Sequence, residues 1–239
     1  MTDPILIYTI LAAPGAPWNL NDDPAQDDTQ MPWRTVLDTI TRRTYWNTGS
    51  VLWGGGAATV EEVAARITTA LNEGGRFRYE DFIGRSRYVV EADMYGNPGY
   101  FDLTAYHNQI TGDGAAALAN CLDMAWGVAA MSNLLGDSMH VMLLDGPFQT
   151  NPVCLVGSDP ADPTSWTASA WAFHAVAWRG SDSDSGAVYD ACLRFDGDPD
   201  ASLIDDYLPL NMYYTSYAST LTSGRIMRGG FDMETELLR

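Results

Sequence analysis

The 239-residue chain contains no lysine, and its 13 basic residues are all arginines, against 31 aspartates and glutamates. A globular chain of this length ordinarily carries on the order of a dozen lysines. The formal net charge is −18, and no cluster of basic residues interleaved with aromatics occurs. Phosphate backbones and anionic membrane surfaces repel such a chain. We therefore expect neither nucleic acid nor a membrane as a partner, whereas a cationic protein surface stays open.

Cysteine is scarce as well. The chain has three, Cys121, Cys154 and Cys192, and no two of them form a Cys-x-x-Cys pair. An odd number without such pairs argues against a disulfide framework and against a thiolate zinc site. We expect a reducing compartment and predict neither a metal nor a cofactor.

Two features of exported or membrane-spanning chains are also missing. The apolar segment 4–13 follows Asp3, and no basic residue precedes Arg34, so the segment lacks the charged start of a secretory signal. No run approaches the roughly 18 apolar residues that a membrane span needs. A cytoplasmic location is the expectation.

The chain does have ample material for a core, with 46% hydrophobic residues, 8 Trp and 12 Tyr. Its length suits a single domain, 1–239, with an N-terminal elaboration over about 1–58, a core over about 59–208 and a tail over 209–239 that covers a sheet. Helical patterns early and strand patterns late predict an α+β fold. The expected helices are 33–46, 59–71 and 121–135, and the expected strands are 4–13, 88–92, 100–106, 139–144, 153–156, 166–179 and 187–195.

The segment from Asn120 to Asp123 predicts a helix that begins at a cysteine. Asn120 is a favoured N-cap, and Asp123 at the third helical position resembles the second half of a capping box. The positive end of the helix dipole and its unpaired N–H groups bias a cysteine there toward the nucleophilic thiolate. Cys121 is therefore the best candidate for a catalytic residue, although a lone cysteine on an apolar helix is more often part of a core.

A predicted hairpin supplies partners for this cysteine. Strands over 166–179 and 187–195 flank a Gly-, Ser- and Asp-rich turn centred near Asp182. In an antiparallel hairpin of this register, His174 pairs with Asp190, and facing side chains share one side of the sheet about 5 Å apart. The carboxylate could then hold the imidazole in one tautomer. A slip of one residue would separate the two side chains, and so long a turn does not fix the register.

A cysteine at the head of an apolar helix, a histidine on a strand about fifty residues later and an aspartate on the next strand resemble the transglutaminase-like superfamily of papain-type cysteine enzymes. The resemblance covers about 120–198. It implies an α+β fold in which the nucleophile helix packs on an antiparallel sheet. By position, it also implies that Cys121 is the nucleophile, His174 the general base and acid, and Asp190 the residue that orients the histidine.

This chemistry is acyl transfer through a thioester. The tetrahedral oxyanion needs donors, for which the N–H of Cys121 and the side chains of Gln109, Asn108 and Asn120 are candidates. Aromatic residues near the site could bind substrate, although such residues more often form a core; they are Trp126, Trp178, Trp171 and Phe173. We expect hydrolysis or deamidation of an amide in a protein or peptide substrate. A crosslinking transglutaminase and a non-catalytic protein-binding module of the same fold are the alternatives.

Two further features carry less weight. The acidic segment 196–206 resembles a calcium loop but lacks the final acidic ligand and the ligand spacing of such loops. Three explanations of the missing lysines stay open: an arginine-favouring genome, adaptation to salt, and an advantage for an enzyme that acts on glutamine or lysine side chains or is delivered into another cell. Compositional bias is the simplest of these.

Overall fold

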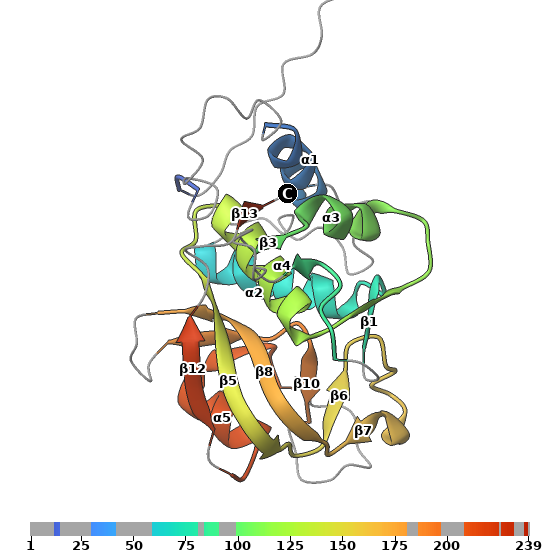
Figure 1. Cartoon of the computed structure of the whole chain (residues 1–239), viewed down its shortest axis with the longest axis vertical. Coiled ribbons are helices and arrows are strands. Elements are labelled where there is room, and N and C mark those ends of the chain that lie inside the picture. Colours follow the sequence, from blue (N-terminus) through green and yellow to red (C-terminus); the bar gives the residue numbers. More distant parts are fainter. Residues whose placement is uncertain are drawn as a thin grey trace, which may run out of the picture.

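The computed structural model describes residues 12–14, 30–41, 59–80, 84–90, 99–180, 186–196, 208–224, 226–231 and 237–238. Five α-helices and several small and large sheets occur in these ranges, which confirms the predicted α+β class. Figure 1 shows most of the helices in the upper part of the picture and the strands of the largest sheet in the lower part. The helices are α1 (Gln30–Thr41), α2 (Val60–Glu73), α3 (Leu103–Thr111), α4 (Cys121–Leu134) and α5 (Tyr214–Leu221).

The largest sheet has five strands in the order β11-β9-β8-β5-β12, and every neighbouring pair is antiparallel. Its centre is the long pair β5 and β8, and positions 174–178 of β8 are all buried, as in a strand covered on both faces. These strands are β5 (His140–Gln149), β8 (Ala170–Arg179), β9 (Ala187–Tyr189), β11 (Asn211–Tyr213) and β12 (Met227–Phe231).

Helix α4 packs against β8 and β5 and is covered on its other side by α2. It is apolar all round and buried along nearly its whole length, as a helix sandwiched between two layers must be. Gly136 follows its end with φ of 102°, a conformation that favours glycine. Helix α2 begins with a capping box, because Thr59 and Glu62 exchange side-chain and backbone hydrogen bonds.

Three small sheets complete the fold. One is a parallel pair and the others have three strands in the orders β10-β6-β7 and β13-β3-β2. The parallel pair is β1 (Phe77–Tyr79) with β4 (Ala117–Ala119); the other strands are β2 (Val89–Val90), β3 (Tyr100–Phe101), β6 (Val153–Leu155), β7 (Trp166–Thr167), β10 (Leu193–Phe195) and β13 (Leu237–Leu238), and a short 3-10 helix, η3 (Pro163–Ser165), precedes β7.

Three of the expected strands are wrong. The strand predicted at 166–179 is two strands, β7 and β8, which belong to different sheets. The strand predicted at 100–106 ends at Phe101, because Asp102 caps α3 by accepting the N–H of Ala105 at 2.8 Å. Tyrosine and phenylalanine favour strands, but the cap decides the local structure here. The strand predicted at 187–195 is two strands, β9 and β10, which belong to different sheets and are separated by a turn at Asp190.

The C-terminal residues do more than cover the sheet, because β11 and β12 form its two edges. Other expectations fall outside the described ranges, namely most of the strand at 4–13, the hairpin turn around Asp182 and nearly all of the calcium-like segment 196–206. No described helix combines the length and apolar character that a membrane crossing requires.

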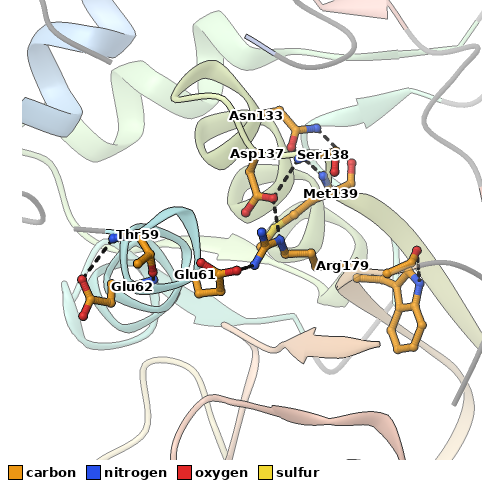
Figure 2. Close-up of polar contacts among 10 residues, drawn as sticks. Thr59, Glu61, Glu62, Asn133, Asp137, Ser138, Met139 and Arg179 are labelled. Atoms are coloured by element: carbon orange, nitrogen blue, oxygen red, sulfur yellow. Dashed lines mark hydrogen bonds and ion pairs between the residues drawn. The ribbon is translucent and has the colours of Figure 1, made fainter. Parts of the chain in front are cut away.

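Arg179 at the end of β8 links three elements, as Figure 2 shows. Its Nε lies 2.9 Å from Oδ1 of Asp137, just after α4, and its Nη1 pairs with Glu61 on α2. Asp137 also accepts the N–H of Ser138 at 2.8 Å. The guanidinium therefore fastens α2 and the end of α4 to the central sheet.

Candidate active site

Cys121 is the first residue of α4, and the predicted capping box is present. Asn120 Oδ1 accepts the N–H of Asp123 at 3.1 Å, and Asp123 Oδ2 accepts the N–H of Asn120 at 3.0 Å. The N–H of Cys121 itself has no acceptor within the helix, as at any helix start. The local sequence thus places the thiol at the positive end of a buried helix.

Asp123 also anchors a second segment, which the sequence did not reveal. Its carboxylate accepts the backbone N–H groups of Arg87, Tyr88 and Val89, the shortest at 2.8 Å, and the hydroxyl of Ser86. Several N–H donors on one carboxylate hold it in a single orientation. Asp123 therefore fixes the start of α4 against residues 86–89.

His174 and Asp190 meet as predicted, although the predicted register is wrong by two residues. Ala177 pairs with Tyr189 across β8 and β9, so the position opposite Asp190 is Val176. A shift of two residues keeps every side chain on its face of the sheet. His174 Nε2 consequently lies 2.9 Å from Asp190 Oδ2, and both side chains are buried.

Asp190 is held on both carboxylate oxygens. Oδ1 accepts the N–H groups of Cys192 at 2.8 Å and Leu193 at 3.1 Å, in the turn that leads from β9 to β10. Oδ2 accepts the hydroxyl of Tyr217 on α5 at 2.6 Å, besides its contact with His174. The sequence missed Tyr217, because it lies in the segment interpreted as a cover of the sheet.

The environment of His174 favours the imidazolium form. Burial by itself would lower the pKa of His174, but the charge and hydrogen bond of Asp190, with a smaller effect of Cys121, raise it to about 10. Nε2 is taken by Asp190, and Nδ1 has no hydrogen bond of ordinary geometry to the described residues. Nδ1 is therefore the ring nitrogen left for the Cys121 thiol.

A pocket of about 260 Å³ opens beside the cysteine. Its wall includes the rings of Tyr79 and Trp171, whose centroids are 5.3 Å apart, and Trp171 also lies edge-on to His174 at 5.1 Å. The buried indole N–H of Trp171 has no acceptor among the described residues. The residues that line the pocket are Tyr79, Glu80, Gly84, Asn120, Cys121, Leu155, Ser169, Ala170, Trp171, Ala172 and Phe173.

Three sequence candidates do not reach this pocket. Gln109 donates its amide N–H groups to the carbonyls of Arg76 and Ala115, so it has none left for an oxyanion. Trp126 and Trp178 are each 1% exposed and pack against Phe101 and Tyr214 respectively. All three have structural roles, Gln109 through its bonds to backbone carbonyls and the two tryptophans through their packing in the core.

The other polar candidates differ in their availability. Asn120 lines the pocket, but its side chain accepts from Asp123 and donates to the carbonyl of Gly84 at 3.1 Å. Asn120 therefore serves chiefly to cap α4 and to hold the backbone of Gly84 in place. Asn108 is not among the residues that line the pocket.

Cys154 and Cys192 lie in environments that disfavour a thiolate. Burial raises the pKa of Cys154 to about 11. Burial and the neighbouring charge of Asp190 raise the pKa of Cys192 well above its usual value. At neutral pH both thiols are protonated, so Cys121 is the cysteine with surroundings suited to nucleophilic chemistry.

Comparisons of the chain with protein-family models, with curated proteins and with solved structures find no match. Among the described residues, no group of three or more His, Cys, Asp or Glu side chains is arranged to hold a metal ion.

Proposed function

We propose that this protein is a thiol-dependent acyl-transfer enzyme that hydrolyses or deamidates an amide of a protein or peptide. One observation carries the proposal: Cys121 at a helix start, an imidazole that interacts with its thiol, and a buried carboxylate on that imidazole converge beside a pocket. Separately, each residue has an ordinary structural explanation. Together they supply a nucleophile, a base and the group that orients the base.

The arrangement supports a two-step reaction. The Cys121 thiolate adds to the amide carbonyl carbon, and the oxyanion meets the N–H of Cys121 and the indole N–H of Trp171, which has no acceptor among the described residues. The C–N bond breaks as the His174 imidazolium gives its proton to the departing amine, which leaves a thioester. His174 then takes a proton from water as the water oxygen attacks the thioester carbonyl. An acid leaves and the thiol is regenerated.

We further propose that the fold is of the papain and transglutaminase type. Helix α4 begins at the cysteine and packs on β8, which carries the histidine, and the aspartate follows the next strand, β9. We propose hydrolysis in preference to crosslinking because water needs no separate channel to the thioester, and two of the four aromatic candidates, Trp126 and Trp178, are packed in the core.

The test follows three products at once. The protein is incubated with glutamine-containing proteins and a small fluorescent amine, while ammonia, new peptide termini and amine incorporation are measured. We expect ammonia or cleavage without efficient incorporation, abolished by Cys121→Ala and unaffected by Cys154→Ala. Incorporation without hydrolysis would indicate a transglutaminase. No product from a broad panel of substrates would favour the non-catalytic binding module.

A further inference from the structure

Three aromatic residues line the pocket beside Cys121. Tyr79 is the last residue of β1, and Trp171 and Phe173 lie near the start of β8. The ring centroids of Tyr79 and Trp171 are 5.3 Å apart, with an angle of 45° between the ring planes. Burial raises the pKa of Tyr79, so its ring carries no charge at neutral pH. This part of the pocket lining is therefore neutral and aromatic.

The pocket leaves apolar surface in contact with water and has room to cover it. Among the described residues, four large apolar side chains are exposed, and Phe173, at 38%, is the one of them that lines the pocket. The small residues Gly84, Ala170 and Ala172 line it as well. The volume of about 260 Å³ exceeds the roughly 150 Å³ that holds a benzene ring inside a protein. A ligand with a ring of this size therefore fits, and covering Phe173 is favourable.

Trp171 contributes both its ring and its N–H to this pocket. The residue is 8% exposed, and its buried indole N–H has no acceptor among the described residues. A buried donor without an acceptor is unfavourable, so a carbonyl oxygen bound in the pocket would supply the missing hydrogen bond. A ligand whose carbonyl accepts this N–H has the atoms next to that carbonyl close to the rings of Trp171 and Tyr79. The ring and the carbonyl of the ligand thus belong to one residue.

We propose that the pocket binds the aromatic side chain of the residue whose carbonyl Cys121 attacks. The ring of this side chain packs against Tyr79, Trp171 and Phe173, and the carbonyl oxygen accepts the N–H of Trp171. The reacting bond is therefore the backbone amide that follows an aromatic residue. This inference rests on the proposed function and names its substrate class. Aromatic rings in contact contribute more than the burial of their area, so a phenyl ring is favoured over an aliphatic group of equal size.

The test compares three covalent probes that differ in one side chain: alanyl-phenylalanyl, alanyl-cyclohexylalanyl and alanyl-alanyl chloromethyl ketone. The Cys121 thiolate attacks the methylene carbon, the carbon–chlorine bond breaks and chloride leaves. The rate at which this thioether forms is followed by mass spectrometry with peptide mapping. We expect the phenylalanine probe to react about tenfold faster than the alanine probe, because it buries a large side chain. It should also react about threefold faster than the cyclohexylalanine probe, which is equally large and apolar but is not aromatic.

A matched pair of variants tests the aromatic lining. Phe173→Leu keeps an apolar side chain but removes the ring, so it should lower the ratio of the phenylalanine rate to the cyclohexylalanine rate by about twofold. Tyr213→Leu removes a ring from an exposed residue of β11 that does not line the pocket, and it should leave the ratio unaltered. Equal rates for the two probes in the native protein, or a ratio that survives Phe173→Leu, would overturn the inference.

Iodoacetamide, which has no side chain to be recognised, separates failure of this inference from failure of the proposed function. If it labels Cys121 faster than Cys154 and Cys192 while the three ketones react equally, the aromatic selectivity is wrong and the thiol enzyme stands. Release of ammonia from protein substrates without new peptide termini would also overturn the selectivity, because the reacting amide would then belong to a side chain. If iodoacetamide and all three ketones label Cys121 no faster than the other cysteines, the proposed function fails and the inference falls with it.

Discussion

At the scale of single residues, Asp190 is the position on which the site depends most. It receives four hydrogen bonds, from His174, Tyr217, Cys192 and Leu193. Two backbone N–H groups fix one oxygen, and two side chains share the other. The carboxylate is therefore preorganised and keeps the imidazole in place, as the proposed catalytic role requires.

Asp190→Asn should slow alkylation of Cys121 by iodoacetamide at pH 7 by about tenfold or more, since the shape is kept while the charge that stabilises imidazolium is lost. Tyr217→Phe removes one hydrogen bond and keeps the charge, so a two- to fivefold effect, about 0.5–1 kcal/mol, is expected. Asp182→Asn and Asp184→Asn serve as controls at positions outside the described residues. If alkylation of Cys121 slowed in either control and not in Asp190→Asn, the assignment of Asp190 as the partner of His174 would be wrong.

We predict that the free energy of unfolding depends on pH through His174. The dependence is best measured in the Cys121→Ala protein, because that variant has no thiolate whose charge could compensate the imidazolium proton. The folded pKa, raised to about 10 in the native protein chiefly by Asp190 against the effect of burial, exceeds the unfolded value of 6.5. The contribution of His174 to the free energy of unfolding is complete below pH 6.5. This contribution is lost as the pH rises toward the folded pKa, by up to about 1.4 kcal/mol per pH unit.

Urea unfolding between pH 6.5 and 8.5 measures this slope, which a further His174→Gln change should flatten. His107→Gln is the matched control, because burial lowers the pKa of His107 and its titration falls below this window. A slope that persists after His174→Gln would mean that another group binds the proton.

At the scale of elements, the contacts of Arg179 join α2, the end of α4 and β8 (Figure 2). The side chains of its two acidic partners differ in burial: Asp137 is 2% exposed and Glu61 is 54% exposed. The hydrogen bond from Arg179 lowers the pKa of Glu61 to about 2, but water screens an interaction at so exposed a site. The contact with Asp137 should therefore contribute more to stability.

Arg179→Gln should lower the free energy of unfolding by about 2–3 kcal/mol, because Asp137 loses its cation while it stays buried. Glu61→Gln should cost less than about 1 kcal/mol. Urea denaturation of the two variants decides the order. Equal losses would show that the exposed pair matters as much as the buried one.

At the scale of the whole molecule, the net charge of −18 opposes compaction, and the chain has no lysine to offset it locally. Raising NaCl from about 0.01 M to about 0.5 M shortens the screening length from about 30 Å to below 8 Å. We expect stabilisation on the order of 1 kcal/mol, seen as a rise of about 2–4 °C in the unfolding midpoint. Calorimetry at neutral pH measures it. Near the isoelectric point of about 4.2 the same salt should have little effect, and an equal rise there would point to a cause other than charge repulsion.

The sequence by itself determined the features that depend on interactions between residues close together in the chain. The capping boxes at Thr59 and Asn120 join residues three positions apart, so the local sequence is sufficient to determine their hydrogen bonds. The position of Cys121 at a helix start follows from the second of them. The pairing of His174 with Asp190 was also predictable, because the alternation of a strand has a period of two and an error of two residues in register preserves the face.

Only the tertiary structure decided which distant residues complete the site. Tyr217 reaches Asp190 across 27 positions because α5 packs near the end of β9, and no local pattern encodes that approach. Glu80 reaches the pocket because β1 pairs in parallel with β4, and both strands are too short to be recognised from the sequence. The burial of Trp126 and Trp178 is likewise a result of tertiary packing. The sequence shows that aromatic residues lie near the predicted site, but the packing of α4 between α2 and the sheet decides which of them are exposed.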